Sequence, residues 1–209
     1  ELWKTDGTAA GTIRVTDSSA GATSSILNGF GVLNGALYFS GTDGSGGFEL
    51  WKTDGTAAGT EMVADIFAGP GGSDPRDFAV FNNMLYFSAT DGVNGRELWK
   101  TDGTAAGTEM VVDIYLGAVN SSPSEFSVFN GALYFSAADA AHGRELWKTD
   151  GTAAGTELVA DIYPGANSSY LYQFSVLNGA LYFGADDGTN GSELWQTDGT
   201  TAGTLMVKD

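Results

Sequence analysis

Cysteine is absent from this sequence of 209 residues. The chain therefore forms no disulfide and no zinc site with thiolate ligands, and cysteine usage does not indicate a compartment. Long apolar stretches are missing too, because no run of 18 apolar residues occurs. We expect no insertion into a membrane.

Positive charge is scarce. Nine Lys and Arg residues stand against 26 Asp and Glu residues, which gives a formal net charge of −17 at pH 7. Nucleic acids and anionic membranes require a basic protein surface, so neither is an expected partner. The sequence starts at Glu1 in the middle of a motif and shows no signal peptide, which predicts a piece of a longer chain.

A repeat dominates what is present. The sequence ELWKTDGTAAGT begins at Glu1, Glu49, Glu97 and Glu145, and the related ELWQTDGTTAGT begins at Glu193. Each step is 48 residues long, without insertion or deletion. A fixed period of this length is typical of solenoids, propellers and similar arrays.

One unit reads as two hairpins. Asn130-Gly131 joins two short apolar and aromatic runs, and Asn-Gly is the strongest short-range hairpin signal. We name these two strands A and B. Strand C lies around Leu146-Trp147, and strand D runs from Glu157 to Tyr163 with alternating side chains, after a turn at Asp150-Gly151.

Four antiparallel strands per unit predict an all-β fold, a β-propeller built from 48-residue four-stranded blades, with about four and a half blades in this chain. A parallel β-solenoid is the alternative, but its coils are usually shorter and need no hairpins. The expected single repeat domain, 1–209, consists of a half blade at 1–17 and blades at 25–66, 73–114, 121–162 and 169–209.

The repeated Asp and Trp are predicted to be structural. Within each motif the Asp can accept backbone N–H bonds, the following Gly can adopt a conformation that a Cβ disfavours, and the Thr hydroxyls can tie the turn. The Trp can cover the hairpin and pack between blades. These turn residues are Asp6, Asp54, Asp102, Asp150 and Asp198 with Trp3, Trp51, Trp99, Trp147 and Trp195.

The motif resembles two known patterns. WKTDGT is partly similar to the Asp-box of sialidase-type propellers, although here the Trp precedes the Asp. ELWKTDGTAAGT resembles the bacterial ELWxxDGT repeat family much more closely, and the 48-residue period covers the whole chain. That resemblance implies a large secreted or surface-exposed bacterial protein of undefined activity.

Catalysis is the less favoured interpretation, because active sites use different residues held once in one place, and this array repeats the same residues. His142 is the only histidine, and it lies in a turn without a nucleophile nearby in sequence. We expect no cofactor. Calcium is kept as an alternative through Asp91, Asn94 and Glu97 of DGVNGRE, whose oxygens are suitable ligands, against the simpler interpretation of an Asp-Gly turn before a strand.

The connections that vary between units are the best candidates for binding. They run through residues 67–77, 115–125 and 163–173, and in an up-and-down blade they share one face. The aromatic candidates for stacking on a sugar or packing on a protein are Tyr115, Tyr163, Tyr170 and Tyr172.

We therefore expect a non-enzymatic extracellular module for adhesion, binding or scaffolding, which presents these loops to a protein or a glycan. Self-assembly through the hairpin at 1–17 is a further expectation, because near-identical units favour exchange between chains. A glycan-binding, lectin-like propeller is the first alternative, and a propeller similar to glycoside hydrolases is the second.

Overall fold

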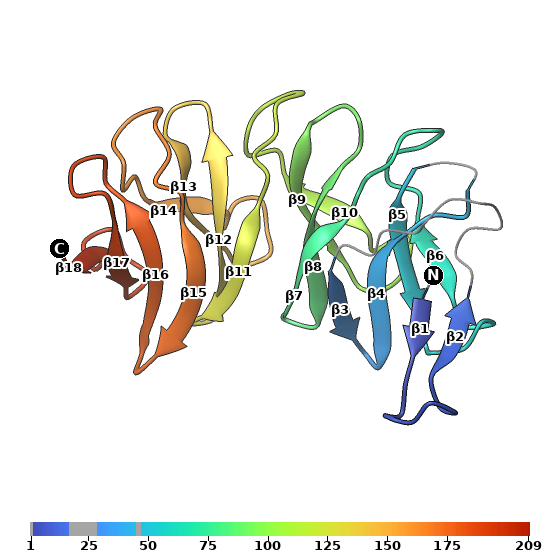
Figure 1. The fold of residues 1–209 in the computed structure, drawn as a ribbon. Coiled ribbons are helices and arrows are strands. Elements are labelled where there is room, and N and C mark those ends of the chain that lie inside the picture. The colour runs from blue at the N-terminus through green and yellow to red at the C-terminus, as the bar shows by residue number, and fades with distance from the viewer. Residues whose placement is uncertain (1, 17–28, 45–46) are drawn as a thin grey trace. The chain divides into compact units, whose positions relative to one another are not determined.

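The structure is a computed structural model that describes residues 2–16, 29–44 and 47–209. It is all-β, with four antiparallel four-stranded sheets and one two-stranded sheet (Figure 1). None of the described residues is helical, so this part of the chain has no helix that could cross a membrane. The chain forms two compact units, residues 1–93 with 99–109 and residues 94–98 with 110–209.

Each four-stranded sheet contains strands A to D in sequence order. Strands A are β3 (Phe30–Leu33), β7 (Arg76–Phe81), β11 (Ser124–Phe129) and β15 (Tyr172–Leu177). Strands B are β4 (Ala36–Gly41), β8 (Met84–Thr90), β12 (Ala132–Asp139) and β16 (Ala180–Asp186). Strands C are β5 (Glu49–Thr53), β9 (Arg96–Thr101), β13 (Gly143–Thr149) and β17 (Ser192–Thr197). Strands D are β6 (Glu61–Ala64), β10 (Glu109–Val112), β14 (Glu157–Ala160) and β18 (Leu205–Lys208). The two-stranded sheet pairs β1 (Leu2–Lys4) with β2 (Ile13–Thr16), at the positions of strands C and D.

The A–B hairpins turn at the predicted residues. Asn130 and Gly131 have φ angles of 47° and 75°, so both central positions of the turn are in the left-handed region. The φ angles of Asn82 and Asn83, 48° and 58°, lie in the same region. Asn tolerates this backbone better than other side chains do, which explains why it replaces Gly there. The hairpin prediction is confirmed.

The turn between strands C and D is held by its own side chains. In the copy at 101–108, Oδ1 of Asp102 accepts bonds from the amide and the hydroxyl of Thr104 at 2.8 and 2.7 Å. The Thr104 hydroxyl in turn accepts from the Gly107 amide at 3.0 Å, and the Thr101 and Thr108 hydroxyls lie 2.8 Å apart. The Thr104 hydroxyl and amide hold the pKa of Asp102 below its usual value.

The second glycine of the motif makes room for this aspartate. A Cβ on Gly107 would collide with the carboxylate of Asp102, and Gly11, Gly59, Gly155 and Gly203 face the same obstacle in the other copies. The motif requires glycine there because the Asp carboxylate occupies the space that a Cβ would need, and not because of the backbone conformation.

Strand D is shorter than predicted. The alternation suggested a strand through Tyr163, but β14 ends at Ala160. The Ile162 amide donates instead to Oε2 of Glu145 at 2.8 Å, so the backbone turns away from the sheet at this point.

Each unit has its own apolar core between successive sheets. In the first unit, Leu33, Tyr38 and Leu50 pack with Leu85 and Phe87 of the next sheet. A second-unit cluster joins the matching residues, Phe129, Tyr134, Leu146, Val159, Leu181 and Phe183. The Trp residues add to these contacts, because Trp99 packs on the first of these clusters, Trp195 on the second, and Trp51 on Leu2, Val15 and Phe39.

The motif lysine links one turn to the next. Lys4 donates to the carbonyl of Gly55 at 2.7 Å, Lys52 to that of Gly103 at 3.1 Å, and Lys148 to that of Gly199 at 3.1 Å. In each case the donor and acceptor are 51 residues apart, so the lysine of one motif reaches the Asp-Gly turn of the following motif.

A double-mutant cycle tests the fit between glycine and aspartate. We expect Gly107→Ala to lower the free energy of unfolding by about 1–3 kcal/mol, because its Cβ overlaps the Asp102 carboxylate. The same substitution should cost clearly less when Asp102→Ala is already present, since the obstacle is gone. Urea unfolding of the four proteins measures the coupling, and equal costs in both backgrounds would contradict the steric explanation.

Candidate functional site

The first glutamate of the motif is buried and holds the loop that leaves its sheet. Glu97 is 0% exposed, and its Oε1 accepts from the Ser121 amide at 2.9 Å. Its Oε2 accepts from the Ser121 hydroxyl at 2.6 Å and from the Ile114 amide at 2.9 Å. Three donors therefore compensate a carboxylate that has lost its water.

The same arrangement recurs in the other described copies that are followed by a further sheet. Glu49 accepts from the amide and hydroxyl of Ser73 at 3.0 and 2.6 Å. Glu145 accepts from the Ser169 amide at 3.1 Å. We call the segments 65–75, 113–123 and 161–171 the connector loops. Each is held by hydrogen bonds to the motif glutamate of the preceding strand C.

The fastened serine also bonds to the next sheet. The carbonyl of Ser73 accepts from the Thr90 amide at 3.1 Å, that of Ser121 from the Ala138 amide at 2.9 Å, and that of Ser169 from the Asp186 amide at 2.8 Å. Strand C of one sheet, the connector loop and strand B of the next sheet are thus joined through one buried serine.

The residue after each serine is held in an unusual backbone conformation. Asp74, Ser122 and Tyr170 have φ angles of 45°, 47° and 50°, although none of them is glycine. Such a conformation costs free energy and persists only where the surroundings fix it. Here the bonds to the serine on one side and a buried residue on the other, Pro75, Pro123 or Leu171, supply that constraint.

The four candidate tyrosines have different environments. Tyr170 is 70% exposed and projects from the third connector loop. Tyr172 is 42% exposed; its ring covers Gly184, and its hydroxyl lies 3.1 Å from that of Ser192. Tyr163 packs on Gly188, where a Cβ would collide with the ring.

Tyr115 occupies the position of Tyr163 in the preceding repeat, but Ala140 stands where Gly188 lies under Tyr163. A groove of about 240 Å³ there is lined by Tyr115, Leu116 and the turn residues Asp139, Ala140 and Ala141. Tyr115 and Tyr163 are both half-buried, whereas Tyr170 and Tyr172 are exposed. Of the four candidates, Tyr170 and Tyr172 are therefore the most accessible to a partner.

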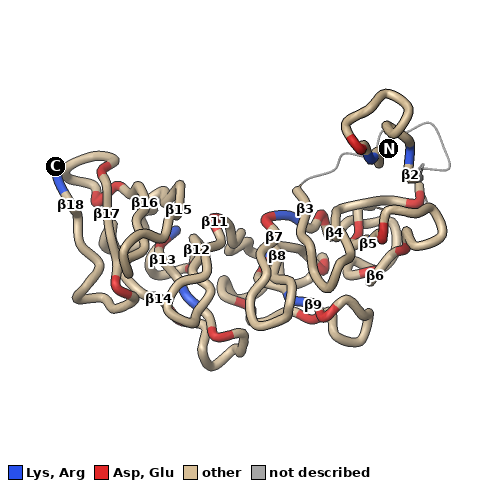
Figure 2. The backbone as a smooth tube through the Cα atoms, turned by 90° about the horizontal axis from the view of Figure 1, so that it is seen from below, with Lys and Arg blue, Asp and Glu red and all other residues tan. Residues whose placement is uncertain are grey.

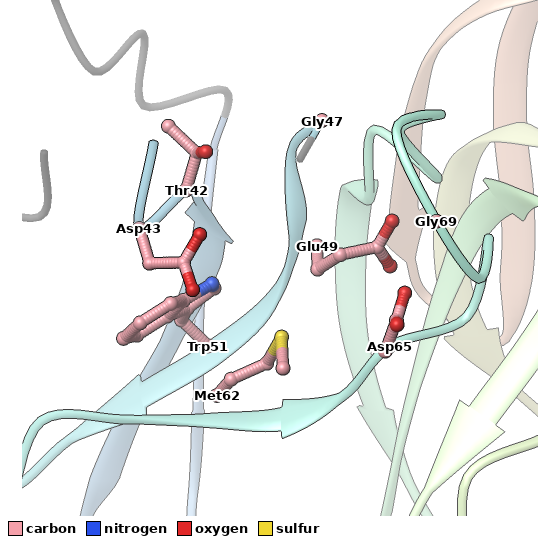
Figure 3. Close-up of a pocket in the computed structure, with 8 residues that line it drawn as sticks. All are labelled: Thr42, Asp43, Gly47, Glu49, Trp51, Met62, Asp65 and Gly69. Carbon is pink, nitrogen blue, oxygen red and sulfur yellow. The ribbon is translucent and has the colours of Figure 1, made fainter. Parts of the chain in front are cut away.

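A small cavity of about 50 Å³ lies beside the glutamate of the first complete sheet (Figure 3). Figure 3 shows the carboxylates of Glu49 and Asp65 turned toward each other, with Asp43 next to the indole of Trp51. Acidic residues recur along the described chain, whereas basic residues are few (Figure 2). The connector loops therefore begin in a strongly acidic environment.

Burial changes the acidity of two of these glutamates. Loss of hydration raises the pKa of Glu97 to about 7, against the opposing hydrogen bonds from Ser121 and Ile114, and the negative charge of Asp113 raises it further. Glu145 behaves in the same way, with a pKa raised to about 7 by burial and by Asp161. Both carboxyls therefore titrate near neutral pH.

The residues of the calcium alternative have other contacts. Asp91 accepts from the Val93 amide at 2.8 Å, and Glu97 is engaged by Ser121 and Ile114. Within residues 2–16, 29–44 and 47–209, no cluster of three or more His, Cys, Asp or Glu side chains is arranged to hold a metal ion. Calcium binding stays a prediction.

The sequence does not predict the connection between glutamate and serine: it indicates the glutamate as the start of a strand and, for Glu97, as an alternative calcium ligand. A usable signal exists, because Ser73, Ser121 and Ser169 each follow a motif glutamate by 24 residues. The serines stand among other Ser and Gly residues, which hides this spacing.

Solved structures with a similar fold belong to large enzymes. A puromycin hydrolase is 13% identical with a TM-score of 0.59, over 96% of this chain and 32% of that one. A structure from a study of two prolyl endopeptidases is 11% identical with a TM-score of 0.60, over 97% of this chain and 29% of that one. The chain thus spans about a third of the length of these proteins.

An alpha-L-arabinofuranosidase from Clostridium thermocellum is 16% identical over 91% of this chain and 76% of that one, but its TM-score of 0.41 supports no argument. No protein-family model matches the sequence, and no curated protein is similar enough to count as a relative. At these identities the likeness shows the fold alone, a β-propeller-like all-β fold.

The raised pKa values predict a pH dependence of stability. Between pH 4.5, the ordinary value, and about 7, the folded chain keeps protons on Glu97 and Glu145 that the unfolded chain releases. The free energy of unfolding should therefore fall as the pH rises through this window, by about 1–3 kcal/mol for each group.

Urea unfolding at several pH values measures this slope. Glu97→Gln removes one titrating group and should flatten the dependence, whatever it does to the absolute stability. Glu109→Gln is the matched control, because the Glu109 side chain is 62% exposed. A slope that Glu97→Gln leaves unchanged would contradict the assignment.

Proposed function

We propose that this chain is part of a non-enzymatic, extracellular β-propeller module that presents the connector loops to a partner, as an adhesion or scaffold protein of the bacterial cell surface. In this proposal the chain belongs to the ELWxxDGT repeat type, its blades belong to a ring or array, and no cofactor is needed.

One observation carries the proposal. The same buried connection holds three loops in which the residue after the serine differs: an exposed aspartate at position 74, a half-buried serine at 122 and an exposed tyrosine at 170. A constant support with variable outward residues is the arrangement of binding scaffolds, in which rigid elements position variable loops. Repetition then multiplies weak contacts through effective concentration.

The repeated polar side chains support a structural role. The motif Asp binds its own turn, the Lys reaches the next turn, and the Glu fastens the connector loop. An active site needs a nucleophile, acid or base directed at a substrate. The residues that recur in this chain are instead used for contacts within the protein.

Glycan binding is the alternative that a specific observation favours. Besides the exposed Tyr170, a groove of about 280 Å³ is lined by Tyr172, Gln173, Ser192 and Glu193, which combine an aromatic ring with polar groups. Sugar recognition uses that combination of stacking and hydrogen bonding. The hydrolase alternative is supported only by the similarity in fold to enzymes about three times as long, so the same experiment should include a test of turnover.

An array of immobilised oligosaccharides, followed by an assay for released reducing sugar, separates these functions. The glycan alternative predicts binding that Tyr170→Ala weakens by about tenfold or more, as expected for an aromatic contact residue. Phe30→Ala is the matched control, because Phe30 is a 49% exposed aromatic residue outside the connector loops. Absence of binding would remove the glycan alternative, and release of sugar would contradict the non-enzymatic proposal.

A further inference from the structure

The turn between strands B and C is built differently in the sheet of β11 to β14. There β12 and β13 stay paired as far as Asp139 and Gly143, so only residues 140–142 lie outside the ladder. In the sheet before it and the sheet after it the strands stop earlier, and residues 91–95 and 187–191 lie outside. Of these three turns, the one at 140–142 is therefore the tightest.

An alanine explains the difference. Gly92 and Gly188 have φ angles of 79° and 78°, in the left-handed region, whereas Ala140 takes their place in this repeat and has no positive φ. A residue with a Cβ disfavours that backbone. The chain forms a shorter turn instead, and its left-handed residue is Gly143 with a φ of 65°.

The carboxylate of Asp139 holds this shorter turn. Its Oδ1 accepts from the amides of Ala141 and His142 at 2.9 and 2.7 Å, and its Oδ2 lies 2.9 Å from Nδ1 of His142. In the following repeat Nδ2 of Asn190 donates to Oδ2 of Asp187 at 2.8 Å, so the histidine takes over a contact that an asparagine makes there. The position of the Asp139 carboxylate is therefore fixed by the turn.

The alanine also takes away the place of an aromatic ring. In the following repeat Tyr163 covers Gly188 so closely that a Cβ would collide with the ring. Ala140 carries that Cβ, so the ring of Tyr115 cannot lie in the equivalent place. The groove of about 240 Å³ is lined both by Tyr115 and by the turn, and it thus follows from one change in the repeat pattern.

The groove has an apolar lining with one carboxylate. The connector loop contributes residues 114–116, an isoleucine, a tyrosine and a leucine, and the turn contributes Asp139, Ala140 and Ala141. Leu116 is 82% exposed, so a partner can reach this surface. All of these residues belong to the second compact unit. Such a lining suits a side chain whose methylene groups end in a charged head.

Acidic residues prevail around the groove. Four of them lie in its lining or close to the turn, namely Asp113, Asp139, Glu145 and Asp161. The basic residues next to the turn are His142 and Arg144, and the Arg144 guanidinium donates to the carbonyls of Ser121 and Ser122. The bond to Asp139 and the charges of three carboxylates nearby raise the pKa of His142, so the field at the turn is negative. Charge complementarity therefore favours a cation here, in a chain of net charge −17.

We propose that this groove binds a basic side chain, an arginine or a lysine, of a partner protein. The aliphatic stem packs on Leu116 and Ala140, and the cationic head lies against the ring of Tyr115 and near Asp139. This inference rests on the proposed function, since it names the partner chemistry for one of the three connector loops.

A capped pentapeptide with one arginine between pairs of alanines is the probe. The same peptide with citrulline is its matched control, because citrulline has the shape of arginine without the charge. Each is titrated into the isotope-labelled chain, and the amide shifts are followed by NMR. We expect the arginine peptide to shift the amides of residues 114–116 and 139–142 and to bind at least about threefold more tightly than the citrulline peptide. No shift at these residues, or equal affinity of the two peptides, would overturn the proposal.

Two variants of the chain test the groove itself. Ala140→Gly lets Tyr115 cover the turn as Tyr163 covers Gly188, and it should weaken binding of the arginine peptide at least about fivefold. Tyr115→Ala removes the ring and should weaken binding by about the same factor. Full binding by either variant contradicts the assignment to this groove.

Tyr170→Ala is the matched control, because it removes a tyrosine that does not line the groove, and it should leave the affinity for the peptide unchanged. An equal loss of binding in this control would show that the peptide binds elsewhere, against the proposal. Failure of the peptide to bind refutes the groove alone, because the oligosaccharide array and the sugar-release assay test the proposed function with another readout.

Discussion

The structure depends on one interaction, the buried carboxylate of the motif glutamate bonded to a serine of the connector loop. Glu97 lies at 0% exposure, and without its three donors such a burial would be strongly unfavourable. The carbonyl of the same serine accepts a hydrogen bond from strand B of the next sheet, so the serine connects two sheets. Successive sheets are thus joined by backbone and carboxylate bonds as well as by apolar packing.

Most residues of the twelve-residue motif have a structural contact, either with another segment or within the turn itself. The Glu fastens the outgoing loop, the Leu and Trp contribute to the packing between sheets, the Lys reaches the next turn, and the Asp with its Thr and Gly partners forms the turn that receives the preceding lysine. Each such motif contacts the following motif through its lysine and receives the lysine of the preceding motif at its turn. A substitution in one copy therefore affects its contacts with both neighbouring motifs. In the connector loops, the serine is the residue that the buried glutamate binds. The exposed residues of these loops make no such contact and can differ between copies.

Much of the fold could be predicted from the sequence, because short-range rules determine it. Asn130-Gly131 requires a tight hairpin, and the 48-residue period gives the number of sheets. The end of strand D and the burial of Glu97 are harder to predict, since both depend on bonds between residues 17 or 24 positions apart, and other Ser and Gly residues hide the 24-residue spacing. The sequence indicates the tyrosines only as aromatic residues in variable connections, and packing alone distinguishes Tyr163, which covers Gly188, from the exposed Tyr170.

Hydrogen exchange of the Ser121 and Ser169 amides, followed by NMR, tests the buried connection most directly. Both residues lie in loops, where amides ordinarily exchange fast. We expect both amides to be protected to within about tenfold of the amides in the central strands, because each donates to a buried glutamate. Exchange at the rate of an unprotected loop would contradict the claim that these glutamates join the sheets.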